Sequence, residues 1–357
     1  MTTKKLMSTV FLVSMLALTS CSKDDDNKTT PANPPDDGTK RVVWVDELIY
    51  YPAGEGNSHS SGDFFRYKFT WENGQLKRWS EYDIDDNLKW YYDFTYENGK
   101  LMALKPDNLH GESITTTLQY DGDRLTRAYE SYNGSTRTYT YEYNAAGELV
   151  KRSLENSQSV EELTWENGNV VKVVDWYNGN IGDGIRTYSY DDRPNPLRTV
   201  YKDVALIGTF MYEYMSLNNV TEYRIQYDYD DDEKVIPYTL TYDGDYVTTQ
   251  RIDYSNYVET KYIHYSDGTG STPQLCNIKV SCNIPTDDRV VYGEGVYTAG
   301  SEVTIRASYA GEYEYLMHDG KLYRFECWSD GITDPVRTFT ATTTATFQAI
   351  YKDIYPQ

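Results

Sequence analysis

Apolar and polar side chains alternate along much of the chain between residues 62 and 268. In the first such segment Tyr67, Phe69 and Trp71 share one face, and the residues between them are polar. A period of two predicts β-strands that bury one face and expose the other. No amphipathic helix of useful length stands out in the sequence, so we expect an all-β protein.

A short motif recurs at the ends of these alternating segments. An apolar residue, one spacer and an aromatic residue precede a turn that contains Gly or Asn, as in Phe69 to Leu76. Asn-Gly and Asp-Gly favour tight hairpin turns because both positions tolerate positive φ. The copies are 22 to 28 residues apart, which fits a repeating hairpin of two strands and two turns. Nine aromatic residues mark the copies and are predicted to form the repeat core: Trp71, Tyr96, Tyr120, Tyr143, Trp165, Tyr190, Tyr214, Tyr242 and Tyr265.

The motif resembles the Tyr-Asp-x-x-Gly-x-Leu repeats, or YD repeats, of the Rhs family, most closely at residues 120–125 and 143–149. Large Rhs proteins coil a long β-strip into a hollow shell around a toxic cargo, and nine copies are too few to close such a shell. We therefore expect residues 41–268 to form an open, curved antiparallel meander of about nine β-hairpin repeats, each contacting mainly its neighbours.

The composition changes after Tyr265. Residues 269–274 read as a linker because of their Gly, Ser, Thr and Pro content. A small, separate all-β module is predicted for residues 275–357. The order of its segments, with Trp328 at the start of a Trp-Ser-Asp-Gly block, resembles divergent internalin-type B repeats. Members of that family serve mostly as spacers or adhesive modules of bacterial surface proteins, so the resemblance implies no catalysis.

The chain opens with Lys4 and Lys5, followed by an apolar run from residue 6 to residue 18. This run is shorter than the roughly 20 residues that a membrane-spanning helix needs, and a charged start before a short apolar core is typical of a secretory signal. The cut site, residues 18–21, resembles the lipobox of bacterial lipoproteins. The resemblance implies that residues 1–20 are removed as a signal peptide and that Cys21 carries lipid. An ordinary signal peptide with an incidental cysteine is the alternative.

Residues 22–26, Ser-Lys-Asp-Asp-Asp, resemble the acidic tag that some lipoproteins use to reach the outer leaflet of the outer membrane. Up to residue 40 the chain holds no apolar side chain larger than Ala32, so residues 21–40 are predicted to be a lipidated, disordered acidic tether. We expect an outer-membrane location, with the lipid-anchored protein facing the cell exterior; an anchor facing the periplasm is the alternative. A membrane barrel is disfavoured, although alternating strands also mark such barrels, because a lipid anchor would be redundant on one.

Net charge limits the class of partner, and tyrosine content indicates the kind of sheet. The chain has a net charge of −21, and removal of the two lysines in residues 1–20 leaves about −23. Nucleic acid is excluded as a partner because its binding depends on Lys and Arg contacts to phosphate. The lipid on Cys21 would be the only contact with the membrane, and we expect a monomer. The 37 tyrosines favour thin sheets with half-buried rings over a deep aliphatic core.

Little in the sequence points to catalysis or metal binding. The four histidines lack metal-ligand spacing, and no nucleophile elbow or phosphate loop occurs. The acidic segments 83–87 and 228–233 are expected to be hairpin turns, with weak calcium binding as the alternative. Export permits a disulfide between Cys282 and Cys327, with buried free thiols as the alternative. No metal, cofactor or catalytic residue is expected.

Three functions stay open. The first is a non-enzymatic surface lipoprotein that acts as a binding or scaffolding repeat protein. The second is glycan capture for a polysaccharide-uptake system, because aromatic rings stack on sugars and Trp44, Trp79 and Trp176 do not fit the main inward pattern. The alternative is that these tryptophans pack on the other face of the sheet or at its ends and bind no ligand. The third is a carboxylate-dependent, glycan-acting enzyme, although no pair of carboxylates stands out.

Overall fold

The computed structural model describes residues 40–54, 58–106, 114–207, 211–227, 232–286, 289–311 and 314–355. The predicted signal peptide, Cys21 and all of the predicted tether except Lys40 lie outside these residues. Among the described helices, none combines the length and the apolar character that a membrane crossing requires.

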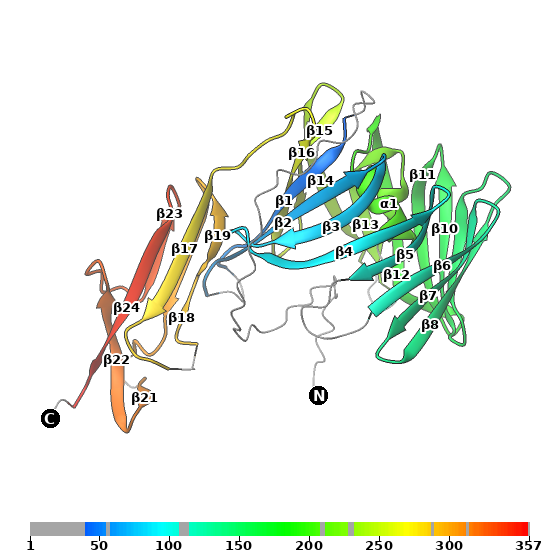
Figure 1. Cartoon of the computed structure of the whole chain (residues 1–357). Helices are drawn as coiled ribbons and strands as arrows, with labels where there is room; N and C mark the ends of the chain where they lie inside the picture. Colours follow the sequence, from blue (N-terminus) through cyan, green and yellow to red (C-terminus); the bar gives the residue numbers. More distant parts are fainter. Residues whose placement is uncertain are drawn as a thin grey trace. The chain divides into compact units, whose positions relative to one another are not determined.

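Sixteen strands of the described chain, β1 to β16, form a closed antiparallel barrel. Each strand pairs with the next in chain order, and β16 pairs back with β1. Figure 1 shows them following one another from blue β1 through cyan and green to yellow β16. The predicted open meander is therefore wrong. The strands are β1 (Val42–Tyr51), β2 (Ser61–Glu72), β3 (Gln75–Tyr82), β4 (Leu88–Glu97), β5 (Lys100–Pro106), β6 (Ile114–Asp121), β7 (Arg124–Tyr132), β8 (Ser135–Tyr143), β9 (Leu149–Leu154), β10 (Ser159–Glu166), β11 (Asn169–Tyr177), β12 (Asn180–Pro194), β13 (Asn218–Gln226), β14 (Lys234–Asp243), β15 (Tyr246–Asp253) and β16 (Val258–Tyr265).

The first strand closes the barrel by completing the last copy of the motif. In each other hairpin the motif aromatic pairs with an aliphatic residue on the following strand, as Trp71 does with Leu76. Tyr265 has no following barrel strand, and its partner is Val42 at the start of β1. The residues before the first recognisable copy therefore supply the missing half of the eighth hairpin.

A β-bulge lies beside the motif aromatic in every one of these eight pairs of strands. A bulge places two residues opposite one and increases the local twist of the sheet. Twist and curvature repeated at the same height around the wall are what a sheet needs to close on itself. Closure thus follows from local geometry in each hairpin rather than from a large number of copies.

The motif aromatics also join neighbouring hairpins through their polar atoms. We use the term seam for the junction of two hairpins, and seam bond for a hydrogen bond from a motif aromatic to the backbone of the preceding hairpin. Trp71 Nε1 donates to the carbonyl of Val42 at 3.0 Å, and the Tyr265 hydroxyl donates to that of Val247 at 2.7 Å. Trp165 and Tyr190 make the equivalent bonds to Leu149 and Val170. Four of the eight motif aromatics, Trp71, Trp165, Tyr190 and Tyr265, make this bond, which a Phe at the same position could not donate.

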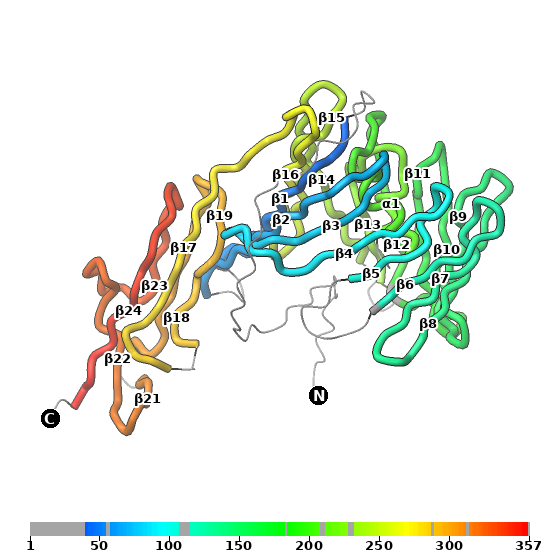
Figure 2. The backbone as a smooth tube through the Cα atoms, in the orientation of Figure 1, coloured from blue at the N-terminus to red at the C-terminus, as the bar shows by residue number. Residues whose placement is uncertain are grey.

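One of the nine predicted copies, the seventh in chain order, is not a hairpin. The turn between β12 and β13 is replaced by an insertion, residues 195–217, with helix α1 (Arg198–Ile207) and the short 3-10 helix η1 (Tyr212–Met215). Tyr214, predicted as a motif aromatic, lies in η1, and α1 contradicts the expectation that no useful helix exists. Tyr201 on α1 packs edge-on against Phe69 and Trp79 of β2 and β3, so the insertion fills the inside of the barrel. In Figure 2 α1 lies among the barrel strands.

The two faces of the barrel wall differ in chemistry. The inward face and the insertion share one apolar core, which includes Phe94, Leu118 and Leu163, as the alternation predicted. The outward face, here called the outer wall, carries exposed polar residues such as Thr95 and ion pairs such as Arg78–Asp93. A transmembrane barrel has the opposite arrangement, with an outward apolar band about 25 Å tall. The outer wall is therefore suited to water rather than to lipid.

The residues after the linker form a second all-β body around a separate core. Trp328 of the Trp-Ser-Asp-Gly block is fully buried there, and its Nε1 donates to the carbonyl of Asp334 at 2.9 Å. One short backbone pairing, Gly295 with Gly62, joins β19 of this module to β2 of the barrel. The module strands are β17 (Leu275–Cys282), β18 (Val291–Tyr292), β19 (Gly295–Thr298), β20 (Glu302–Ala307), β21 (Leu316–His318), β22 (Lys321–Trp328), β23 (Val336–Thr340) and β24 (Ala345–Asp353).

The predicted disulfide does not form. Cys282 on β17 and Cys327 on β22 pair with Ala349 and Ile350 on β24, which lies between the two strands. Strands two places apart in a sheet are separated by about 9.6 Å, beyond the roughly 7 Å that a disulfide can span between Cα atoms. Both thiols are free, as is that of Cys276.

Candidate functional site

The inside of the barrel is occupied by protein. Trp79, predicted as a sugar-stacking ring on the second face, points inward instead. Its ring is enclosed by Trp90 at 5.2 Å, Tyr92 at 5.7 Å and Tyr201 of α1 at 5.4 Å between centroids. Trp79 is therefore part of the core, and a ligand-binding surface has to be sought on the outer wall.

Buried charges tie the insertion to the wall from within. Arg152 on β9 donates to Glu161 on β10 at 2.8 Å and to the carbonyl of Ile207 at the end of α1 at 2.6 Å. The Tyr212 hydroxyl of η1 donates to the same Glu161 carboxylate at 2.5 Å. A buried charge needs such partners because desolvation alone costs several kcal/mol. Sequence reasoning missed this network, since nothing in the alternating pattern distinguishes Arg152 from a solvent-facing arginine.

A cavity of about 10 Å³ lies between η1 and the wall, lined among others by Glu213, Tyr238 and Gln250. Glu213 Oε2 and Gln250 Oε1 are shielded from solvent and have no hydrogen-bond partner. Burial raises the pKa of Glu213 to about 7, although the charges of Arg186 and Lys261 oppose the shift. A space of this size holds about one water molecule. This cavity is too small for a substrate. The raised pKa makes Glu213 a point of pH sensitivity in the core.

The outer wall presents one tryptophan as a flat, supported ring. Trp44 on β1 lies in register between His264 on β16 and Lys68 on β2. Its indole stacks on the His264 imidazole, with 4.3 Å between the ring centroids and 20° between the planes. Trp44 is 37% exposed, whereas His264 is 5% exposed. One face of the indole therefore rests on a buried ring, while the side chain remains open to solvent.

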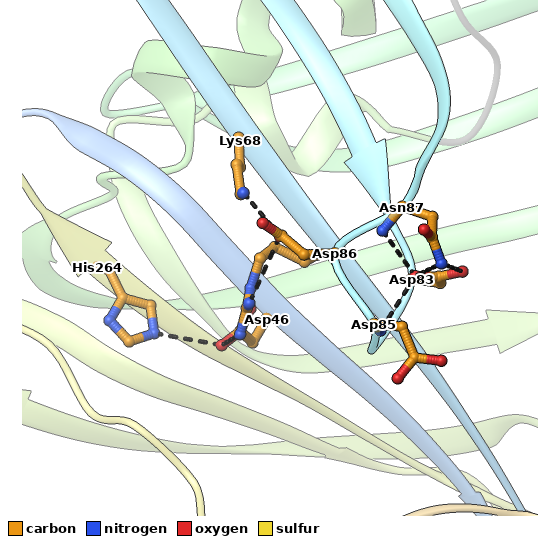
Figure 3. Close-up of polar contacts among 8 residues, drawn as sticks. Asp46, Lys68, Asp83, Asp85, Asp86, Asn87 and His264 are labelled. Atoms are coloured by element: carbon orange, nitrogen blue, oxygen red, sulfur yellow. Dashed lines mark hydrogen bonds and ion pairs between the residues drawn. The ribbon is translucent and has the colours of Figure 1, made fainter. Parts of the chain in front are cut away.

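A buried carboxylate lies beside His264 beneath the indole. Oδ2 of Asp46 lies 3.7 Å from His264 Nε2, and Asp46 accepts two hydrogen bonds from Arg66, at 2.6 and 3.0 Å (Figure 3). Burial acts to raise the pKa of Asp46, but the contacts with His264 and Arg66 outweigh it and hold the pKa below its ordinary value. Arg66 thus fixes the carboxylate beside the imidazole, although His264 Nε2 is buried and makes no hydrogen bond within the described chain.

The linker covers the other side of His264. Gly270 forms an isolated bridge with His264, and a Cβ at position 270 would lie 2.9 Å from Nδ1 of the imidazole and from the carbonyl of Ile263. With φ of +152°, position 270 suits glycine alone. The residues predicted only as a spacer therefore help to fix the ring that supports Trp44.

The acidic turn at residues 83–87 lies beside this cluster and is a plain turn held by protein partners (Figure 3). The Asp83 carboxylate accepts from the backbone N–H groups of Asp85 and Asn87 and pairs with Lys89 at 2.7 Å. Asp86 pairs with Lys68 at 2.7 Å. Within the described chain no group of three or more acidic, His or Cys side chains is placed to hold a metal ion.

The other predicted site residues have separate positions. Trp176 lies on the outer wall, half-buried, and its Nε1 donates to Glu162 at 2.9 Å. Four residues of the second acidic segment, 228–231, lie outside the described residues, and its Glu233 pairs with Arg224 at 2.8 Å. Cys21 also lies outside them. Trp44 alone combines exposure with a supporting ring among the three predicted stacking tryptophans.

Comparisons with known proteins give a likeness in architecture only. No family model and no curated protein sequence matches the chain. The chain is similar to a porin-like protein from Bacteroides uniformis, with 15% identity, a TM-score of 0.41, and coverage of 63% of this chain and 97% of that one. A porin-like protein from Bacteroides vulgatus gives 10% identity, a TM-score of 0.37, and coverage of 62% and 97%. A chain of a TcdB2–TccC3–Cdc42 structure gives 11% identity, a TM-score of 0.26, and coverage of 75% and 16%. Likenesses this distant carry no functional argument, and the barrel itself rests on the pairing of its own strands.

Proposed function

We propose that this chain is a lipid-anchored binding protein of the outer membrane whose barrel stands in water and captures neutral glycan through its outer wall. The observation that carries the proposal is the position of Trp44 on its buried support, His264. A ligand bound there would meet the wall and not the inside of the barrel, which the insertion fills.

A supported indole suits a sugar ring for two reasons. It offers a large apolar surface to the C–H face of the sugar and has an N–H for a polar partner. His264 and Asp46 hold it in place, so little conformational freedom is lost when a ligand binds. Lys68, in register beside Trp44, is already paired with Asp86, so the surroundings carry little free charge and favour a neutral ligand.

The proposed location of the protein is supported by its sequence and by the chemistry of its outer wall. The signal, the lipobox ending at Cys21 and the acidic tag support export and anchoring. The polar outer wall supports a barrel that lies outside the bilayer and is tethered to it. In cells, replacement of Cys21 by alanine is expected to release the protein from the membrane fraction, whereas a chain that stays there without this cysteine would contradict the anchor. Protease added to intact cells should remove the wild-type protein if it faces the exterior.

Binding is tested with the mature chain and a panel of neutral and acidic polysaccharides. We expect saturable quenching or enhancement of tryptophan fluorescence with a neutral polysaccharide. Trp44→Ala should weaken the affinity at least about tenfold, the equivalent of roughly 1.4 kcal/mol. His264→Ala keeps the indole but removes its support and should give an intermediate loss.

Tyr177→Ala is the matched control, because Tyr177 is a 58% exposed aromatic residue at another strand end and has no part in the cluster. This variant should bind as the wild type does. Equal binding by Trp44→Ala and wild type would refute the proposed site, and binding of acidic polysaccharides alone would refute the ligand class.

A further inference from the structure

One seam of the barrel contains a groove at the place where four other seams contain a bond. Tyr120 is the motif aromatic of β6, and by the pattern of the four bonded seams its hydroxyl would donate to the Leu101 carbonyl on β5. Within the described chain the Tyr120 hydroxyl makes no hydrogen bond. The two strands pair through Ala103 with Thr117 and Leu104 with Thr116. Beyond these pairs, toward Leu101 and Tyr120, no seam bond joins the two described strands.

A groove of about 370 Å³ occupies this position. Pockets that bind small ligands start at about 300 Å³. The groove combines an aromatic ring and apolar surface with amides and charged groups at its edge. Its lining residues are Glu97, Asn98, Lys100, Met102, Leu118, Gln119 and Tyr120.

The polar groups of the groove are partly fixed by their own contacts. The Tyr129 hydroxyl donates to Gln119 Oε1 at 2.7 Å, which leaves the amide N–H₂ group of Gln119 as a donor for a ligand. The Lys100 ammonium pairs with Asp123 at 2.9 Å, donates to the carbonyl of Gly122, and lies 5.8 Å from the centre of the Tyr120 ring. Lys100 therefore joins the tip of the β4–β5 hairpin to the tip of the β6–β7 hairpin, and Asp123 balances its charge.

We propose that this groove binds one ring of a neutral sugar, so that the barrel has a second glycan contact besides Trp44. The ring of Tyr120 and the side chain of Met102 would take the C–H face of the sugar. The Tyr120 hydroxyl and the amides of Gln119 and Asn98 would take its hydroxyl groups. The inference deepens the proposed function, and it rests on that function for the choice of ligand.

The charges favour a neutral ligand over an anionic one. Asp123 neutralises Lys100, and Glu97 adds a carboxylate at the edge of the groove. The whole chain carries a net charge of −21, which repels anions from the wall at long range. A sulfated or carboxylated sugar should bind more weakly than its neutral counterpart for both reasons.

The experiment uses the mature chain with isotope-labelled methionine methyl groups, and glucose, galactose and N-acetylglucosamine as probes. The Met102 signal, assigned with Met102→Leu, should shift saturably with at least one probe. The signal of Met317, which is 72% exposed in the C-terminal module, should not move. A sulfated glucose should shift Met102 less at equal concentration.

Two tyrosine variants give a matched pair. Tyr120→Phe removes only the hydroxyl and should weaken the sugar-dependent shift about three- to tenfold, the usual range for one hydrogen bond to a ligand. Tyr96→Phe is the control, because the Tyr96 hydroxyl also makes no hydrogen bond within the described chain but does not line the groove. Met102→Trp should fill the groove and abolish the response of the neighbouring Leu118 methyl groups, observed in leucine-labelled protein.

The outcomes separate this inference from the proposed function. If polysaccharide changes the Trp44 signal while no probe moves Met102, the groove is not a site and the proposed function stands. If Met102 responds while Trp44→Ala binds as the wild type does, the groove stands and the Trp44 site fails. An equal or larger shift with the sulfated sugar would overturn the neutral ligand class.

Discussion

Replacing Glu213 by glutamine should stabilise the protein at alkaline pH and leave its stability unchanged in acid. Glu213 belongs to η1, and one of its carboxyl oxygens is shielded from solvent without a hydrogen-bond partner. Burial raises its pKa from 4.5 to about 7. Glutamine has nearly the same shape and stays neutral, so the variant removes the ionisation and little else.

The magnitude follows from the two pKa values. Below pH 4.5 the carboxyl is protonated in both the folded and the unfolded chain, so it contributes no pH dependence. Between pH 4.5 and 7 the unfolded chain ionises and the folded chain does not, which lowers the free energy of unfolding as the pH rises. A difference of 2.5 pH units at 1.36 kcal/mol each gives a loss of up to about 3 kcal/mol above pH 7. The glutamine variant escapes this loss.

Urea unfolding followed by tryptophan fluorescence at about pH 4, 6 and 8 measures the effect. The difference in unfolding free energy between Glu213→Gln and wild type should grow with pH and level off above pH 7. A difference that is the same at all three values, or a variant less stable than the wild type at pH 8, would show that Glu213 is not held neutral in the core. Glu233→Gln is the control, because Glu233 is exposed and paired with Arg224 outside the core.

Three other variants test the fold. Tyr265→Phe removes a buried seam bond and should lower the free energy of unfolding by about 1–2 kcal/mol, whereas Tyr96→Phe should cost less because its hydroxyl makes no such bond. Arg152→Met leaves Glu161 as an unpaired buried charge and should cost about 3–5 kcal/mol, much of which the double variant Arg152→Met, Glu161→Met should recover in thermal unfolding. In Gly62→Ala the new Cβ would lie 2.2 Å from the carbonyl oxygen of Val296, so hydrogen exchange of the β19 amides should speed up while that of the barrel amides does not.

The sequence was sufficient to predict the strands, the repeat and the inward face. These features depend on local chemistry: Asn-Gly turns favour hairpins, and alternation places Phe69 and Trp71 on the same side. The Trp or Tyr at each motif position is also visible in the sequence, but the seam bonds that four of them make depend on the neighbouring hairpin.

Closure could not be predicted from the copy number. It depends on a partner for Tyr265 that lies more than 200 residues earlier in the chain, at Val42, which belongs to no recognisable copy. A single sequence contains no signal for such a long-range pair, since Val42 reads as an ordinary strand residue. The bulges that curve the wall are equally invisible, because they arise from the pairing of two strands.

The insertion, in contrast, has a signal in the sequence. Asn195-Pro196 is a typical helix start, and Asn195 accepts a hydrogen bond from the N–H of Leu197. Apolar residues follow at helical spacing from position 197 to position 205. The alternation of Tyr212, Glu213 and Tyr214 is typical of a strand, but no Gly turn follows Tyr214, and these residues form η1.

The candidate site was predicted in part. Trp44 stands out in the sequence because it lies outside the repeat, but its support by His264 and Asp46 joins strands at opposite ends of the barrel chain. Trp79 looked equivalent and is in the core, because the bulge in β3 after Leu76 shifts the alternation and turns its side chain inward. Only the register of paired strands distinguishes the two tryptophans.

Closure of the barrel is the central claim, and cross-linking β1 to β16 tests it most directly. Leu48 on β1 is the register partner of Thr260 on β16. The variant Leu48→Cys, Thr260→Cys should form a disulfide under mild oxidation, identified by mass spectrometry of the linked peptides, while Leu48→Cys, Thr140→Cys, with Thr140 on β8, should not. In an open sheet the fifteen strand spacings of about 4.8 Å would separate β1 from β16 by about 70 Å. Failure of the first pair to cross-link within one chain would contradict the closed barrel.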